Sequence, residues 1–236
     1  MNTVVDVGNT DVKIARFDRR DLISLERFSK ESLPEHLAHF IKGNCLYSGS
    51  GMDQPELIEA VERKKGIILS SKTPLPIRLN YETIETLGLD RIANMCGARC
   101  IYTQGPVLAI DMGTCITYDI LDSYDTYQGG AIAPGWQMRL KSMHLQTARL
   151  PLAPANTHPQ PVGKSTMECL QSGAYWGMRS EISGMIALYS KWYSGLNVII
   201  TGGDHVHFEN ADKSPIFATP NLTVIGLNEI LLHNIH

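Results

Sequence analysis

The sequence has few of the features that mark secreted, membrane-spanning or metal-clustering proteins. Its five cysteines are an odd number with no Cys-x-x-Cys pair, which argues against a disulfide framework and against a zinc ribbon. No apolar run is long enough to cross a bilayer, and no basic segment leads into an apolar one near residue 1. These absences predict a cytoplasmic protein without a membrane partner.

An excess of positive charge is also absent. The 236 residues carry a formal net charge of −3, so bulk electrostatics gives no reason to expect nucleic acid as a partner. The apolar fraction of 43% and charged fraction of 19% are ordinary for a globular protein, and the chain is long enough to bury a substantial core.

One internal similarity stands out against this ordinary background. Asp6-Val7-Gly8-Asn9-Thr10 and Asp111-Met112-Gly113-Thr114 each follow an apolar strand-like run and precede a second alternating one. We call them the first and second Asp-x-Gly loops. A repeated supersecondary unit suggests two similar domains, and the break at Gln104-Gly105-Pro106 predicts them at 1–105 and 106–236.

The hydrophobic periodicity predicts an α/β protein. Helical patterns cover residues 55–65, 89–102 and 165–193, and short strand-like runs cover 44–48, 66–69 and 197–201. Ser165 and Glu168 have the spacing of a capping box at the start of the longest helix. Alternating strand and helix patterns are typical of the α/β class.

The two loops are candidates for holding phosphate. A tight turn after a strand can direct several backbone N–H groups at one point, while Thr10, Thr114 and Lys13 add further donors. Asp6 and Asp111 could hold a cation opposite the phosphates. The alternative is an ordinary hairpin turn, where Asp and Gly are common for geometric reasons. Two copies in matching contexts favour nucleotide binding.

Gly88-Leu89-Asp90-Arg91 lies at the start of the helix predicted over 89–102 and has two interpretations. It is either a helix start with a solvated neighbour, or a site where Asp90 accepts a proton from a substrate hydroxyl and Arg91 anchors an anion. Gly202-Gly203-Asp204 follows a buried strand and leaves room for a flat ligand, such as an adenine or a ribose. Taken alone, the motif is better explained by a plain strand-to-loop turn.

Three further patterns are interpreted as structural. Gly163-Lys164-Ser165-Thr166 resembles the end of a P-loop, but the required earlier glycine is His158 and prolines interrupt the loop. His205-x-His207 has no third metal ligand nearby. Cys96 and Cys100 lie four apart on a predicted helix, where small buried thiols are expected.

Taken in order, the motifs resemble those of the type III pantothenate kinases, which include Bvg accessory factor-like proteins. The resemblance covers nearly the whole chain. Its motifs are Asp6-x-Gly-Asn-Thr, Gly88-x-Asp-Arg, Asp111-x-Gly-Thr, Gly129-Gly130-Ala131-Ile132-Ala133-Pro134-Gly135, Gly163-x-x-Thr166 and Thr201-Gly-Gly. Cys115 departs from the pattern, which more usually has alanine there.

The resemblance implies two duplicated actin-like, sugar-kinase-like (ribonuclease H-like) α/β domains with an active-site cleft between them. It also implies a homodimer that phosphorylates pantothenate with ATP in the first step of coenzyme A synthesis. Mg²⁺ would accompany ATP, and a monovalent cation, K⁺ or NH₄⁺, would bind Asp111. Asp90 would be the general base.

The remaining site residues implied by the resemblance fall into two sets. The ATP-binding set is Asp6, Val7, Gly8, Asn9, Thr10, Asp11, Val12, Lys13 and Thr114. The substrate-binding set is Tyr81, Gly88, Leu89, Asp90, Arg91 and Thr166.

Two other functions stay open at this point. The residues alone do not name pantothenate, so the chain could be a kinase for another small alcohol. It could also be a catalytically inactive accessory or regulatory protein of the same family. The presence of the carboxylates Asp6, Asp90 and Asp111 argues against an inactive protein.

Overall fold

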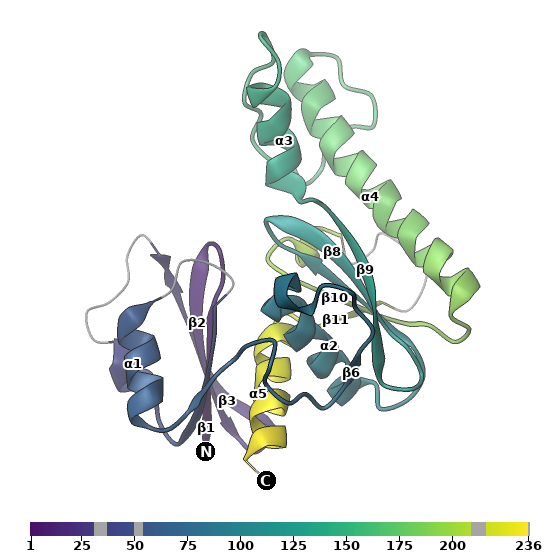
Figure 1. The fold of residues 1–236 in the computed structure, drawn as a ribbon. Coiled ribbons are helices and arrows are strands. Elements are labelled where there is room, and N and C mark those ends of the chain that lie inside the picture. The colour runs from purple at the N-terminus through teal and green to yellow at the C-terminus, as the bar shows by residue number, and fades with distance from the viewer. Residues whose placement is uncertain (31–36, 50–53, 209–215, 236) are drawn as a thin grey trace. The chain divides into compact units, whose positions relative to one another are not determined.

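The chain forms two compact units (Figure 1). The structure is a computed structural model that describes residues 1–30, 37–49, 54–208 and 216–235. The first unit comprises Met1–Gln104, Ser123–Gly129 and Asn221–His236, and the second comprises Gly105–Asp122 and Gly130–Pro220. The domain boundary expected between residues 105 and 106 remains a prediction. The first compact unit contains the N-terminal segment together with two segments that come later in the chain.

The first unit contains a five-stranded sheet of order β3-β2-β1-β4-β5. Its strands are β1 (Asn2–Val7), β2 (Asp11–Asp18), β3 (Asp21–Ser29), β4 (Asn44–Gly49) and β5 (Ile67–Ile68), with β6 (Arg78–Leu79) outside this sheet. Its helices are η2 (Leu37–Phe40), α1 (Pro55–Arg63), η3 (Ile84–Thr86), α2 (Leu89–Ile101) and α5 (Leu222–Asn234).

The central strand β1 is buried along its whole length, because both faces of the sheet are covered. Side chains alternate between the faces of a strand. Val5 and Val7 therefore point into the apolar cluster that includes α1 residues Leu57 and Val61. Asn2 points to the opposite face, where its side-chain amide nitrogen donates a hydrogen bond to Oδ1 of Asn228 in α5 at 3.0 Å. Asp6, four residues after Asn2, lies on that same face.

Helices α2 and α5 pack against each other closely enough to require small residues. A Cβ on Gly226 would lie 1.7 Å from the carbonyl oxygen of Ala93, and a Cβ on Gly97 would lie 2.6 Å from that of Leu222. Nearby, Thr223 donates its hydroxyl to the buried Asn94 Oδ1 at 2.9 Å. This contact fixes α2, and with it the Gly88-Leu89-Asp90-Arg91 segment at its start.

The second unit is built on a second sheet and one long helix. Its strands are β7 (Val107–Met112), β8 (Cys115–Leu121), β9 (Thr126–Pro134), β10 (Asn197–Thr201) and β11 (Ile216–Ala218). Its helices are α3 (Trp136–Leu145), α4 (Thr166–Trp192) and η4 (His205–His207). The strand order is β11-β10-β7-β8-β9, and the first residues of β9, which belong to the first unit, pair with β6.

The core of the second unit lies between its sheet and α4. Leu108, Ile110 and Met112 of β7 point into a cluster with Met178 and Ile182 of α4. Helix α3 lies beside α4 (Figure 1). Because side chains alternate along β7, Asp111 lies on the opposite face from this core.

Most elements expected from periodicity are confirmed within a few residues of their ends. The helix expected at 89–102 is α2, the one at 165–193 is α4, and the strand at 197–201 coincides with β10. The mixed α/β class is confirmed. Among the described residues, no helix has both the length and the apolar composition needed to cross a membrane.

Candidate functional site

The first Asp-x-Gly loop joins β1 to β2 and brings a lysine to the buried aspartate. In the antiparallel ladder Asp6 pairs with Lys13, and Lys13 Nζ lies 3.3 Å from Asp6 Oδ2. Asp6 is 3% exposed, and its burial raises the pKa of the carboxyl, an effect that Lys13 opposes. Asn9 and Thr10 at the tip of the loop are exposed. The loop therefore presents exposed backbone beside a fixed ion pair.

Asp90 lies within electrostatic reach of Asp6. Its negative charge is among the causes that raise the pKa of Asp6. Asp90 is the second residue of α2, and its Oδ1 accepts a hydrogen bond from the Arg91 amide at 2.9 Å. The N-cap is Gly88, without a side-chain cap, so Asp90 satisfies one of the free amides of the first turn. It therefore has a structural contact, and it also lies near the first Asp-x-Gly loop.

Arg91 is buried beside two tyrosine rings. Its Cζ lies 6.0 Å from the ring centroids of both Tyr81 and Tyr127, a distance at which a guanidinium is attracted to an aromatic face. The two rings are stacked with centroids 5.9 Å apart. Tyr127 is 0% exposed and Arg91 is 6% exposed. The structure thus brings together two of the predicted substrate residues, Tyr81 and Arg91, and adds a third residue, Tyr127, to them.

The backbone holds Tyr81 beside Tyr127. β6 pairs with β9 in parallel, with Leu79 opposite Tyr127, and the Asn80 amide donates to the Tyr127 carbonyl at 2.9 Å. Gly129 has φ +84°, and a Cβ there would lie 3.6 Å from the Tyr81 ring. Tyr81, Asp90, Arg91 and the first Asp-x-Gly loop all belong to the first unit.

The second Asp-x-Gly loop joins β7 to β8 and is one residue shorter than the first. Asp6 pairs with the residue seven positions later, whereas Asp111 pairs with Thr117, six positions later. The Gly8 amide accordingly donates to Asp11 O, and the Gly113 amide to Cys115 O, both at 3.0 Å. The two hairpins are confirmed, but the residue opposite the aspartate is lysine in one and threonine in the other.

Neither loop glycine is required by the packing of the chain itself. A Cβ on Gly8 would lie 3.4 Å from Asp11 O and one on Gly113 would lie 3.7 Å from Cys115 O, both ordinary contacts, and neither residue has a positive φ. The space beside each glycine is therefore open to a ligand that approaches the backbone closely.

Gly202-Gly203-Asp204 differs in this respect. Gly202 has φ +93°, and a Cβ would lie 2.4 Å from Met112 O and 2.5 Å from Asp111 Oδ1. The Asp204 amide donates to Met112 O at 3.1 Å. Burial raises the pKa of the Asp204 carboxyl, and His207 opposes that effect. This turn is packed against the strand that carries Asp111, while a Cβ on Gly203 would meet no atom within 4 Å.

Thr166 is the first residue of α4 and is exposed. The predicted capping box is confirmed with one difference, because Glu168 accepts from the amide of Lys164 and not from that of the N-cap residue Ser165. Ser165 Oγ accepts from the Glu168 amide at 3.2 Å, and Glu168 Oε2 accepts from the amide of Lys164 at 2.7 Å. No described strand directly precedes Gly163, so this segment is a helix cap and not a P-loop.

The histidine and cysteine pairs have structural surroundings. His205 and His207 lie in η4, where His205 Nδ1 is 2.6 Å from Gly202 O and the His207 ring lies 5.5 Å from Trp136. Burial raises the pKa of the Cys96 thiol, and raises that of Cys100 to about 11. Within the described ranges, no group of three or more His, Cys, Asp or Glu side chains is arranged to hold a metal ion.

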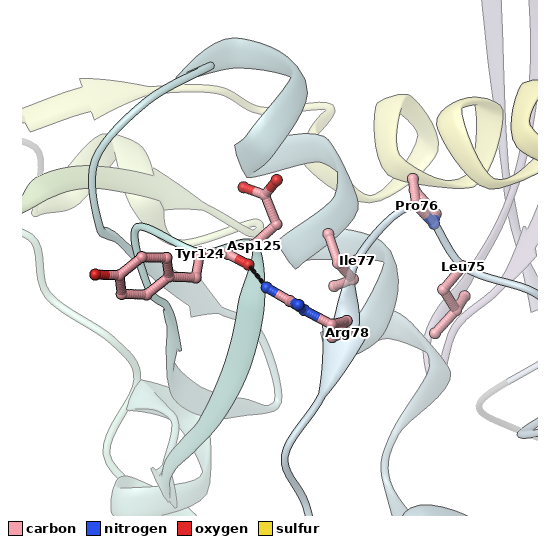
Figure 2. Close-up of a pocket in the computed structure, with 6 residues that line it drawn as sticks. All are labelled: Leu75, Pro76, Ile77, Arg78, Tyr124 and Asp125. Atoms are coloured by element: carbon pink, nitrogen blue, oxygen red, sulfur yellow. Dashed lines mark hydrogen bonds between the residues drawn. The ribbon is translucent and has the colours of Figure 1, made fainter.

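The first unit also contains a hollow, and other residues line it. Figure 2 shows its six residues, with the Arg78 guanidinium directed at the Tyr124 carbonyl, to which it donates a hydrogen bond. Its volume is about 220 Å³, below the usual range for small-molecule sites. None of the predicted site residues lines it. The lining residues are Leu75, Pro76, Ile77, Arg78, Tyr124 and Asp125.

The model of the type III pantothenate kinase family matches residues 2–188. The chain belongs to this family. Its relatives include a type III pantothenate kinase from Bacteroides fragilis, 39% identical over 239 residues that cover 99% of this chain and 98% of the relative. Another, from Cytophaga hutchinsonii, is 36% identical over 235 residues and covers both chains completely.

Solved structures agree with the actin-like, sugar-kinase-like fold expected for type III pantothenate kinases. A structure described as a Baf family transcriptional activator from Campylobacter jejuni has a TM-score of 0.66 at 22% identity, covering 99% of this chain and 98% of the other. A ROK family glucokinase from Streptomyces griseus has a TM-score of 0.54 at 10% identity and covers 98% of both chains. At these identities the likeness concerns the fold.

The sequence did not indicate Tyr127. It lies in β9, outside every motif of the type III pantothenate kinase resemblance, and its neighbours Tyr81 and Arg91 are distant in sequence. Local patterns carry no signal for a long-range ring contact. Asp111, Thr114 and Thr166 lie in the second unit, and their roles stay predictions.

Proposed function

We propose that this protein transfers the γ-phosphoryl group of ATP to the primary hydroxyl of pantothenate, forming 4′-phosphopantothenate and ADP. The observation that carries the proposal is the family match over residues 2–188, together with full-length relatives named as type III pantothenate kinases. The arrangement of Asp6, Lys13, Asp90 and Arg91 in one unit supports it. No observation favours an inactive accessory protein or another alcohol.

ATP is assigned to residues 6–13 and to Thr114. Support comes from the exposed tip of the first loop, the open space beside Gly8 and the position of Lys13. Phosphoryl transfer of this kind passes through a loose, in-line transition state, so positioning and charge neutralisation supply most of the catalysis. Lys13 supplies one positive charge at the loop.

Asp90 is assigned as the general base. As the pantothenate oxygen bonds to the γ-phosphorus and the bond to the ADP oxygen breaks, the hydroxyl proton passes to Asp90. Its hydrogen bond from the Arg91 amide fixes the carboxylate at the first turn of α2. Arg91 and Tyr81 are assigned to pantothenate, with Gly88 and Leu89 contributing backbone. Arg91 pairs with the carboxylate of pantothenate.

Mg²⁺ is proposed to bind together with ATP and to neutralise phosphate charge. It is usually held by one or two carboxylates plus substrate phosphates, which suits a chain whose described residues form no three-ligand cluster. Asp6 is the nearby carboxylate of the first loop. Asp111 is proposed to hold a monovalent cation, K⁺ or NH₄⁺, and Thr166 to contact pantothenate.

The decisive experiment measures ADP and phosphopantothenate formation by the purified chain with pantothenate, with and without K⁺. Product formation that requires K⁺ in the wild type and is lost in Asp111→Asn is the expected result. Turnover of another alcohol but not of pantothenate would remove the substrate assignment. Cation-independent turnover would remove the role of Asp111.

A homodimer and a cytoplasmic location are further parts of the proposal. Both rest on the resemblance to the family. Sedimentation velocity at micromolar concentration tests the dimer, and a monomer at every concentration would contradict it.

A further inference from the structure

One glutamate of α4 joins a strand to a neighbouring helix in the second unit. Glu181 Oε1 accepts a hydrogen bond from the Tyr118 hydroxyl of β8 at 2.8 Å. Its other oxygen, Oε2, accepts from Arg139 Nη2 of α3 at 2.6 Å. Burial and the Glu181 carboxylate raise the pKa of Tyr118, so this hydroxyl remains a donor at neutral pH.

Arg139 extends this contact to the end of β9. While Nη2 bonds Glu181, Nε donates to the carbonyl oxygen of Pro134 at 2.8 Å. A planar guanidinium can serve two acceptors in a fixed geometry, which a lysine ammonium cannot reproduce. Pro134 is the residue before Gly135, the N-cap of α3.

Gly135 lies directly on the second Asp-x-Gly loop. Its amide donates to Thr114 O at 3.1 Å. A Cβ at this position would lie 2.3 Å from Gly113 O and 2.5 Å from Thr114 O, so the two backbones are in close contact. A movement of the Pro134-Gly135 turn is therefore transmitted to Thr114.

We propose that Glu181 and Arg139 are positioning residues for nucleotide binding, because they hold the Pro134-Gly135 turn against Thr114. The inference rests on the proposed function, which assigns Thr114 to ATP. The Arg139 and Glu181 side chains are 20% and 29% exposed. Partly exposed ion pairs add little to the free energy of unfolding, so the main effect of this pair is to fix the position of the turn. Small displacements of a binding group can cost large factors in activity.

The test measures binding of a non-hydrolysable ATP analogue to the full chain by calorimetry, alongside the KM for ATP and for pantothenate. Arg139→Lys keeps the charge but loses the double contact, and Glu181→Gln keeps the size but loses the charge. Each is expected to weaken nucleotide binding by roughly tenfold, the effect of one charge-assisted hydrogen bond. The KM for pantothenate is expected to change less than twofold.

Two controls separate positioning from stability. Tyr118→Phe removes a bond to the same carboxylate but leaves the Arg139 contacts, so it is expected to lower the melting temperature and keep nucleotide affinity. Arg63→Met breaks an exposed ion pair in α1 and is expected to change neither the melting temperature nor the nucleotide affinity.

Wild-type nucleotide affinity in both Arg139→Lys and Glu181→Gln would overturn the inference. A wild-type chain that binds no nucleotide would overturn the proposed function and the inference together, whereas nucleotide binding without pantothenate turnover would affect the substrate assignment alone.

Discussion

Lys13 lies directly across the β1–β2 ladder from Asp6, with its ammonium 3.3 Å from the carboxylate. The carboxyl is buried, and its pKa is raised, chiefly by burial, although Lys13 opposes this effect. The negative charge of Asp90 raises it further. The charged form of this carboxylate is therefore destabilised in the folded protein, which lowers the free energy of unfolding wherever Asp6 is ionised.

This pair predicts a pH-dependent difference between the wild type and Asp6→Asn. Because the folded-state pKa of Asp6 is above its ordinary value of 3.8, the folded state favours the protonated carboxyl. The stability that the neutral group provides is fully present below that ordinary value and is lost as pH rises through the folded-state pKa. Asp6→Asn cannot ionise, so its free energy of unfolding should rise relative to the wild type over this window. Urea unfolding at a series of pH values measures it, and a pH-independent difference would contradict the prediction.

Asp90→Asn should separate nucleotide binding from chemistry. The amide keeps an oxygen that can accept from the Arg91 N–H, but it cannot take the substrate proton. We expect kcat to fall by on the order of 10²-fold or more with ATP affinity retained. Steady-state kinetics and calorimetry with an ATP analogue give the two quantities. Unchanged turnover would remove Asp90 as the base.

Arg91 and Tyr127 should affect the KM for pantothenate. Arg91→Ala removes the anion anchor and should raise this KM by about tenfold or more, with a smaller effect on the KM for ATP. Tyr127→Leu removes one aromatic face beside the guanidinium and should raise the same KM, whereas Tyr127→Phe keeps the ring and should resemble the wild type.

Phe17→Leu is the matched control for Tyr127→Leu, because Phe17 is an equally buried aromatic residue elsewhere in the first unit. It should lower the melting temperature without changing the KM for pantothenate. An unchanged KM for pantothenate in Arg91→Ala would mean that Arg91 has a purely structural role.

Two glycine substitutions should have opposite effects. Gly113→Ala places its methyl group where the chain leaves room, so the free energy of unfolding should be unchanged or higher by up to about 1 kcal/mol. The same methyl group would lie next to Thr114, which is assigned to ATP, so the KM for ATP should rise. Gly130→Ala would place Cβ 1.7 Å from Tyr118 O and should lower the free energy of unfolding by about 3 kcal/mol. Thermal unfolding and ATP kinetics distinguish them, and normal ATP kinetics in Gly113→Ala would argue against a nucleotide at this loop.

The parts of the structure that the sequence predicted are those determined by neighbouring residues. Both Asp-x-Gly hairpins, the α2 helix after Gly88 and the capping contact of Ser165 depend on residues fewer than ten positions apart. Such local signals are strong because turn geometry and helix ends restrict the residue types that fit.

The remaining features depend on residues far apart in sequence. The contact between Tyr81 and Tyr127 and the path from Glu181 through Arg139 to Gly135 arise only when strands and helices pack. The one-residue difference between the two loops was also missed, because the alternating patterns after Gly8 and Gly113 look alike until strand register is known. Packing and register are the information that a single sequence carries least directly.

The hydrogen bond between Asn2 and Asn228 constrains the order in which the protein can fold during synthesis. β1 is the first strand to be synthesised, yet one face of its sheet is covered by α5, which is translated after the whole second unit. The first unit therefore cannot complete its core while the ribosome is still adding the second. Its closing step pairs segments more than 200 residues apart, and contacts of such long range slow folding. The nascent N-terminal sheet consequently lacks the cover of α5 while the second unit is translated, and transiently exposed surface of this kind favours aggregation.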